Sequence, residues 1–416
     1  MLKIACDIVD VTPDSNGLIG FTAPEQPMEP RDPLFARLFL LRCEAGDSLI
    51  ISIDYGGLYC SAHDLWRAEL ATALDIPLNR VILHCMHQHD APFVHIEAVE
   101  VMNAKVNWQW FEKVRKVVND TALLLPEKLQ DVAELGWSEK RLYGYASNRR
   151  VPMDDGSLAV RFSRCGDPEV RNRPAGLIDP MLRTLGFYGK DGRMLAAWNF
   201  YATHPQVGNE GKRFSADAPG EAMRILQERF PEVSLSCFNG CFGNITAGKY
   251  SSPDDLEGNI KHFGRLVADG ITQNLQNQER FAPDNISWQR EVFDFPLRKF
   301  TGEELAQRYP VVQAALIAGE NYGKNHGEEF AIEMLTLGES RIIFFNGELF
   351  IEYQLMAQAM IPDEKLAVVG NCGDSFFYVG TAEALSDPAG YEVREFCRAL
   401  PEFEGLFRNA LQKLFR

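Results

Sequence analysis

The chain has 416 residues, of which 46% are hydrophobic and 24% are charged, and its formal net charge is −16 at pH 7. This is ordinary globular composition, and the length suits two or three average domains or one large catalytic domain. So acidic a chain lacks the basic footprint that nucleic acids and anionic membranes require, which argues against both as partners. No apolar run approaches the ~18 residues that cross a bilayer, so we expect no membrane span.

The N-terminal segment and the cysteines both bear on where in the cell the protein is located. The segment 1–7 reaches acidic residues without the apolar core of a signal peptide. Nine cysteines at irregular spacing are typical of reduced thiols. We therefore expect a cytoplasmic protein. Because no internal repeat or Ser/Gly-rich linker divides the chain, we expect a single catalytic domain over 1–416; the sequence leaves homo-oligomerisation open.

Predicted strands and helices alternate along the chain. The strands are expected at 49–55, 81–86, 194–202, 233–238, 341–345 and 366–369. The helices are expected at 65–74, 110–124, 217–230, 256–276, 302–319, 349–361, 391–398 and 403–415. The first two strands and the helix between them form a βαβ unit, and Asp217 is the expected N-cap of its helix. The alternation predicts an α/β fold with mixed β-sheets flanked by helices.

The most informative polar group follows the strand at 81–86, where the sequence reads His87-Gln88-His89. Alternating residues of a strand point to one face, so we expect His87 and His89 to project together from its end. Histidine is the commonest protein ligand of zinc. A His-x-His pattern also arises by chance, so other ligands are needed to support a metal site.

Three further polar side chains follow apolar strands elsewhere in the chain. His204 follows the strand at 194–202, Glu348 follows the strand at 341–345, and Tyr378 lies past the strand at 366–369. Open α/β sheets place their ligands at the carboxyl ends of strands. Two histidines and a carboxylate form a catalytic zinc set that leaves a position open for water, and Tyr378 offers a further ligand.

Each of these residues also has a structural alternative. His204 before a proline also fits a hydrogen-bonded core histidine, and Glu348 also fits the acidic first turn of the following helix. Tyr378 stands among aromatic residues and would by default be packing. The same ligands would also accept iron or manganese instead of zinc.

A series of short motifs runs in order along most of the chain. They are Asp10-Val-Thr-Pro13, Asp32-Pro-Leu-Phe-Ala-Arg37, Ser52-Ile-Asp-Tyr-Gly-Gly-Leu58, His87-Gln-His-Asp-Ala-Pro92, Asn148-Arg-Arg150, Asn199-Phe-Tyr-Ala-Thr-His-Pro205, Ser215-Ala-Asp-Ala-Pro-Gly220, Gly347-Glu348, Tyr378-Val-Gly-Thr381 and Gly390-Tyr-Glu392. This ordered set resembles the catalytic domain of the neutral/alkaline, non-lysosomal ceramidases and their smaller bacterial relatives. The resemblance implies the fold of that domain, with the site at strand carboxyl ends.

The resemblance also implies roles for individual residues. The family's zinc ligands map onto the set proposed from the strand ends: His87, His204, Glu348 and Tyr378. His89 matches the residue that contacts the substrate carbonyl or moves a proton, and Tyr391 matches a tyrosine that donates a hydrogen bond to the developing oxyanion. Arg149 lies near the position of a family arginine that orients the substrate, and Arg150 is an equally good candidate for that role. The implied reaction is attack by zinc-bound water on an amide carbonyl.

Two departures from the family pattern bear on the substrate. Thr246 stands where the ceramidases carry a serine in the Gly-rich loop, and Asp90-Ala91 replaces Ser-Gly. Thr246 could bind substrate or simply hydrogen-bond local backbone. Asp90 could accept a hydrogen bond from a ligand histidine or bind a cationic substrate group. We also expect the chain to lack the ceramidases' C-terminal β-sandwich, and therefore expect the fold and metal chemistry to transfer better than the substrate does.

These observations lead to a principal hypothesis and two alternatives. The principal hypothesis is a zinc-dependent hydrolase that cleaves the amide bond of a small molecule and does not act on ceramide. One alternative uses the same metal for an esterase, lactonase or lyase reaction. The other is a metal-binding protein without turnover, which the complete ligand set disfavours.

Overall fold

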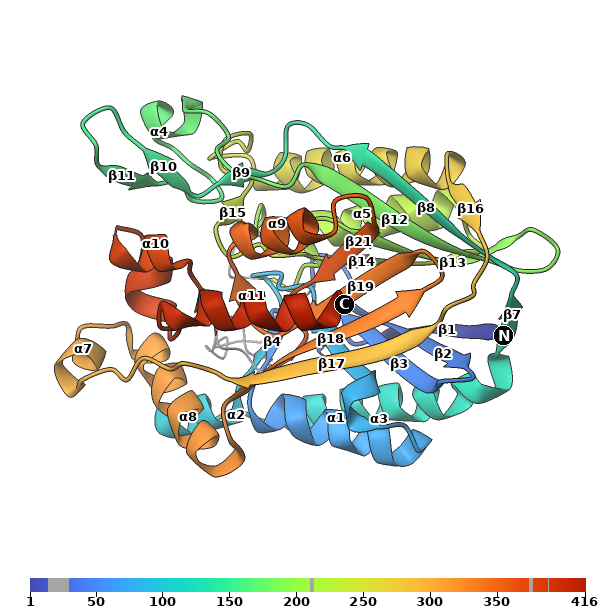
Figure 1. Ribbon diagram of the computed structural model, residues 1–416. Helices are drawn as coiled ribbons and strands as arrows, with labels where there is room; N and C mark the ends of the chain where they lie inside the picture. The colour runs from blue at the N-terminus through green and yellow to red at the C-terminus, as the bar shows by residue number, and fades with distance from the viewer. Residues whose placement is uncertain (14–29, 210–212, 374–376, 388) are drawn as a thin grey trace.

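The computed structural model describes residues 1–13, 30–209, 213–373, 377–387 and 389–416 and is built on three larger β-sheets (Figure 1). The first sheet has the order β5-β3-β2-β1-β7. Its strands are β1 (Leu2–Asp10), β2 (Phe35–Cys43), β3 (Gly46–Ile53), β5 (Val81–Cys85) and β7 (Gln130–Val132). β3 and β5 pair in parallel across α1 (Ser61–Leu74), which confirms the predicted βαβ unit. α1 and α3 (Gln109–Leu124) cover one face of this sheet.

The second sheet has the order β14-β13-β12-β8-β16 and contains one parallel pair, β13 with β14. Its strands are β8 (Glu134–Arg141), β12 (Met181–Tyr188), β13 (Met194–Phe200), β14 (Ser234–Phe238) and β16 (Glu279–Phe281). α5 (Asp217–Arg229) and α6 (Leu256–Gln276) lie along its outer face, at the top of Figure 1.

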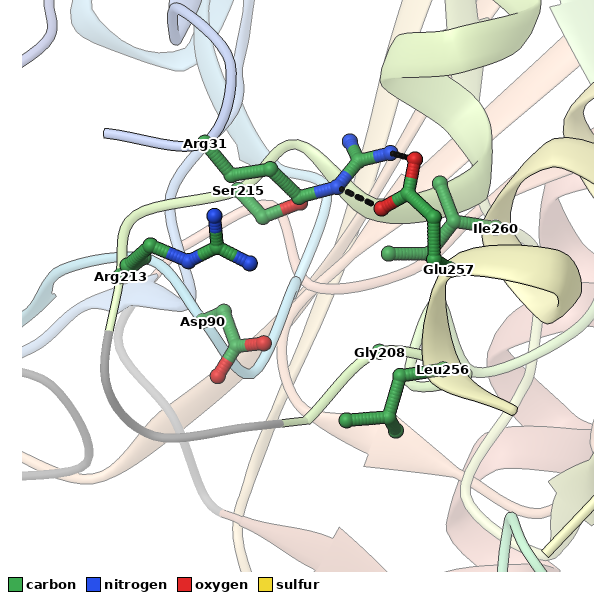
Figure 2. A pocket seen from close by; sticks show the side chains of 8 residues that line it. All are labelled: Arg31, Asp90, Gly208, Arg213, Ser215, Leu256, Glu257 and Ile260. Carbon is green, nitrogen blue, oxygen red and sulfur yellow. Dashed lines mark hydrogen bonds and ion pairs between the residues drawn. The ribbon is translucent and has the colours of Figure 1, made fainter. Parts of the chain in front are cut away.

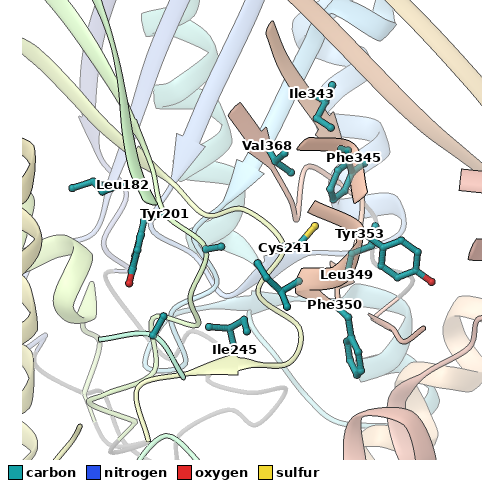
Figure 3. Close-up of a cluster of buried hydrophobic side chains, with 14 of the residues drawn as sticks. Leu182, Tyr201, Cys241, Ile245, Ile343, Phe345, Leu349, Phe350, Tyr353 and Val368 are labelled. Carbon is teal, nitrogen blue, oxygen red and sulfur yellow. The ribbon is translucent and has the colours of Figure 1, made fainter. Parts of the chain in front are cut away.

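The third sheet has the order β17-β18-β19-β21, with β19 and β21 in parallel. Its strands are β17 (Ser287–Asp294), β18 (Glu329–Leu337), β19 (Ser340–Phe345) and β21 (Lys365–Val369). α9 (Ile351–Met360) and α11 (Glu402–Leu414) pack on it through a cluster of apolar side chains that also reaches the second sheet. Figure 3 shows Cys241 and Ile245, from the loop after β14, among these side chains.

The inner faces of the three sheets share one apolar core. Alternate residues of all three sheets contribute, with Phe39 from β2 packing edge-on against Trp198 of β13 at a centroid distance of 5.5 Å. Helices therefore lie outside and sheets inside, and the loops at one end of the sheets come together. The predicted class, mixed sheets flanked by helices, is confirmed.

Most predicted elements are found with limits that differ by a few residues, and three predictions are wrong in a more important way. The helix expected at 302–319 is two helices, α7 (Gly302–Ala306) and α8 (Pro310–His326), because Pro310 begins a new helix and disfavours helical backbone in the residue before it. Residues Glu392–Phe396 form a π-helical turn instead of an α-helix. Asp217 is the first residue of α5, after the N-cap Ala216, and its carboxylate accepts the backbone N–H of Gly208 at 2.8 Å.

Short two-residue strands connect the loops at the site end of the sheets. They pair as β4 (Gly57–Leu58) with β6 (Phe93–Val94), β9 (Ser147–Asn148) with β15 (Ile245–Thr246), and β20 (Glu348–Leu349) with β22 (Tyr378–Val379). Within the described part of the chain, none of the helices combines the length and the apolar character that a bilayer crossing needs.

Candidate functional site

His87 is placed by a sharp turn just after β5. The strand ends at Cys85, and His87 has a left-handed backbone with φ of 66°. The strand alternation predicted for His87 and His89 is therefore wrong, although their rings do meet, at a centroid distance of 5.2 Å. Nδ1 of His87 lies 2.6 Å from the backbone carbonyl of Gly56. This acceptor keeps the proton on Nδ1 and leaves the lone pair of Nε2 facing the site.

His204 is held in the same way by the loop after β14. It follows the end of β13 at Phe200. Its Nδ1 lies 2.8 Å from the carbonyl of Phe242 and 3.0 Å from that of Ile245. The Phe242 ring packs against the His204 ring at 4.7 Å. Two backbone acceptors therefore fix the tautomer and orientation of this imidazole, with Nε2 again directed inward.

Glu348 and Tyr378 face the histidines from the short β20–β22 pair, whose strands come after β19 and β21 of the third sheet. They are direct partners in the parallel β20–β22 pair, which brings the two side chains together. Oε2 of Glu348 lies 3.2 Å from Nε2 of His204 and 3.4 Å from Nε2 of His87. The hydroxyl of Tyr378 lies 3.4 Å from Nε2 of His204. The four groups predicted as metal ligands are thus brought to one point, and all are buried.

This spacing fits a tetrahedral metal ion better than a set of direct hydrogen bonds. Two atoms each about 2.1 Å from a zinc ion lie about 3.4 Å apart at the tetrahedral angle. The separations of 3.2–3.4 Å among the imidazole nitrogens, the carboxylate and the phenol are close to that value. Neutral imidazoles, a carboxylate and a phenol are also the donor types that zinc accepts, so the residues fit the ion.

Electrostatics keep these groups in the forms that a cation needs. Burial and the charge of Arg149 lower the pKa of His204 to about 4, so its imidazole is neutral. Burial alone would raise the pKa of Glu348, but His87 and His204 hold that pKa well below its usual range. Burial and the nearby Glu348 raise the pKa of Tyr378 well above its usual value. The cluster therefore holds an ionised Glu348 carboxylate beside the neutral ring of His204.

His89 lies beside the cluster and is held by a residue that the sequence did not single out. Its Nδ1 is 2.9 Å from the side-chain amide of Gln206, two positions after His204. Its Nε2 is buried and has no hydrogen-bond partner among the described residues. Burial, together with His87 and His204, lowers the pKa of His89 well below its usual value. The His87, His89 and His204 nitrogens come within 4.8 Å of one another, so His89 is close enough to serve the same centre.

Arg149, and not Arg150, faces the site. Nη1 of the buried Arg149 donates to the hydroxyl of Tyr391 at 2.5 Å and to that of Tyr378 at 3.0 Å. Arg150 turns away and donates to the carbonyl of Ala389 at 2.6 Å. Because Arg149 donates to the hydroxyl oxygen of Tyr391, the hydroxyl hydrogen of Tyr391 points away from Arg149. The structure thus decides between two arginines that the sequence left equal.

Thr246 and Asp90 occupy different surroundings. Thr246 pairs with Ser147 in the β9–β15 ladder, and its hydroxyl is buried without a hydrogen-bond partner among the described residues. Asp90 lines a cavity of about 70 Å³ together with charged side chains. Figure 2 shows the guanidinium of Arg213 beside Asp90, and Arg31 paired with Glu257. The ligand-histidine nitrogens that Asp90 was expected to reach are already bonded to backbone carbonyls.

The supporting residues around the cluster carry weak sequence signals. Gly56, Phe242 and Ile245 act through backbone carbonyls, which no residue type reveals. Gln206 is the exception, because its position just after His204-Pro205 could have marked it as a residue of the site. Phe93, whose ring lies 5.5 Å from His87, reads in the sequence as ordinary core.

Comparison with solved structures gives two extensive matches. The chain superposes on the neutral ceramidase of Pseudomonas aeruginosa with a TM-score of 0.75 at 15% identity, covering 99% of this chain and 74% of that one. A structure described as ceramidase complexed with C2 matches with a TM-score of 0.73 at 14% identity, with the same coverage. No protein-family model and no curated protein matches the sequence. The chain has the fold of the neutral ceramidase structures, as the ordered motifs predicted.

Proposed function

We propose that the protein is a zinc-dependent hydrolase that cleaves an amide bond of a small polar molecule. The observation that carries the proposal is the convergence of four donor atoms from His87, His204, Glu348 and Tyr378 on a ceramidase fold, where Glu348 lies 3.4 Å from His87 and 3.2 Å from His204, and Tyr378 lies 3.4 Å from His204. When bound there, zinc would polarise the substrate carbonyl and lower the pKa of a water molecule.

The chain's own residues account for the remaining chemistry. His89 is neutral, and because the side-chain amide of Gln206 donates to its Nδ1, its Nε2 carries the ring hydrogen and donates a hydrogen bond to the substrate carbonyl oxygen. Arg149 donates to Tyr391, which directs the Tyr391 hydroxyl hydrogen toward the oxygen that gains charge as the carbonyl carbon becomes tetrahedral. The C–N bond then breaks, giving a carboxylic acid and an amine.

Asp90, next to His89, favours a polar substrate over ceramide, because it stands where the ceramidases carry a small residue. The cavity of about 70 Å³ that Asp90 lines is lined by none of the four proposed ligands, so it bears on the substrate only through Asp90.

The test is a paired panel of N-acyl anilides, matched phenyl esters, lactones and a short-chain ceramide. We expect the zinc-loaded protein to hydrolyse at least one anilide, releasing acid and amine, and His204→Ala to lose that activity. Turnover of esters or lactones alone would assign the metal centre to the alternative reaction. Amide hydrolysis that survives in His204→Ala would overturn the proposed centre.

A further inference from the structure

A second cluster of metal-binding side chains lies apart from the candidate site, where α1 and α2 (Ile96–Val101) begin. It consists of Cys60, His95 and Glu97, whose ligand atoms all lie within 4.8 Å of one another. The short β4–β6 pair brings them together, and the Tyr59 N–H extends this pair by donating to the carbonyl of Val94 at 3.0 Å. Cys60 is the second residue after β4 and His95 is the first after β6, so the β4–β6 pair brings the two residues close together.

The distance between His95 and Glu97 in this cluster is close to the distances in the candidate catalytic centre. Nδ1 of His95 lies 3.5 Å from Oε2 of Glu97, long for a hydrogen bond and close to the ~3.4 Å expected for two ligands of one tetrahedral zinc. The other oxygen of Glu97 accepts the backbone N–H of Ser61 at 3.1 Å, which fixes the carboxylate. The ring of His95 stacks on Tyr59 at 5.2 Å with an interplanar angle of 13°. Both ligand side chains are therefore held in place.

The donor types select a particular class of ion. A thiolate and a carboxylate together neutralise the charge of a divalent ion, and an imidazole completes a set with sulfur, nitrogen and oxygen. Sulfur ligands favour zinc over magnesium or calcium. Cys60 is the N-cap residue of the 14-residue helix α1. Cys60 and His95 are each only 1% exposed, so an ion bound by them would be largely shielded from solvent.

We propose that Cys60, His95 and Glu97 bind a second, structural zinc ion. Binding replaces the thiol proton of Cys60, which is released to solvent, and a fourth position remains on the side of Glu97, whose side chain is 22% exposed. This ion would join the β3–α1 connection to the β5–α2 connection. Those connections contain Gly56, which holds His87, and Phe93, which packs on it. The second zinc would thus position a catalytic ligand without touching substrate.

The experiment replaces the bound metal with Co²⁺ and records absorption. Cobalt bound to a thiolate gives a sulfur-to-metal charge-transfer band, and the candidate catalytic set contains no sulfur. We expect the band in the wild-type chain and in His204→Ala, and we expect Cys60→Ala to lose it. Metal analysis should give two zinc ions per chain in the wild type and one in each variant. Cys165→Ala, which removes another buried cysteine, is the matched control and should keep both ions and the band.

The outcomes separate this proposal from the proposed function. If the wild-type chain holds only one metal ion and still shows the band, the result would support the site at Cys60 and overturn the zinc site of the proposed function. No thiolate band in the wild type, or a band that persists in Cys60→Ala, would overturn the second site, and the cluster would then be a metal-free thiol–imidazole–carboxylate group. The spectrum of the wild type answers the question even if Cys60→Ala does not fold.

Discussion

At the scale of single residues, His89 and His204 differ in their partners although both lie within reach of the centre. Two backbone carbonyls fix His204, whereas His89 accepts a hydrogen bond from Gln206 and has an Nε2–H without a partner among the described residues. We expect His204→Ala to lose one equivalent of zinc. We expect His89→Ala to keep that zinc and to lose about 10²- to 10³-fold in kcat, the usual contribution of one hydrogen-bond donor to a developing oxyanion. Loss of the zinc in His89→Ala would show instead that His89 is a ligand.

His84 gives a prediction about pH and stability. It is buried between Ser52 and Asn239, and burial lowers its pKa to about 4, below the value near 6.5 of an unfolded chain. The unfolded state therefore takes up the proton first, so stability is complete above pH 6.5 and is lost as pH falls toward 4. The loss at pH 5 is about 2 kcal/mol. In urea unfolding at pH 7.5 and pH 5, we expect His84→Gln to lose about 2 kcal/mol less than the wild type. An equal loss in both proteins would contradict this.

At the scale of elements, the site depends on the close approach of the loop after β14 to the β20–β22 pair. A Cβ on Gly243 would lie 2.4 Å from the carbonyl oxygen of Glu348 and 3.1 Å from that of Leu349, both backbone atoms. Gly243→Ala should therefore displace Glu348, weaken zinc binding and cost about 1–3 kcal/mol of stability, as overpacking does. Gly166→Ala is the matched control, because nothing lies within 4 Å of its added Cβ. Equal zinc affinity in the two variants would refute the argument.

The elements also show how far the sequence could predict the structure. The helix expected at 256–276 has those limits, and the strands before His204 and Glu348 were found, because periodicity is strong in long buried segments. The left-handed turn at His87 was missed because φ depends on tertiary contacts and not on residue type. The cluster at Cys60 was missed for another reason: the two-residue strands that assemble it are too short to show any periodicity.

At the scale of the whole molecule, the candidate centre takes ligands from segments that follow strands of all three larger sheets. His87 follows β5 of the first sheet, His204 follows β13 of the second, and Glu348 and Tyr378 lie in the β20–β22 pair, after β19 and β21 of the third. The unfolded chain cannot assemble this set, so zinc stabilises only the folded state. Free zinc at 100 times its Kd adds about 2.7 kcal/mol for each site. We expect chelation to lower Tm by several degrees, and Tm to recover with added zinc. In His204→Ala, added zinc should raise Tm less than in the wild type, because only the site at Cys60 still binds the ion. In the double variant with Cys60→Ala, added zinc should leave Tm unchanged. A double variant whose Tm still rises with zinc would place the bound ion elsewhere in the chain.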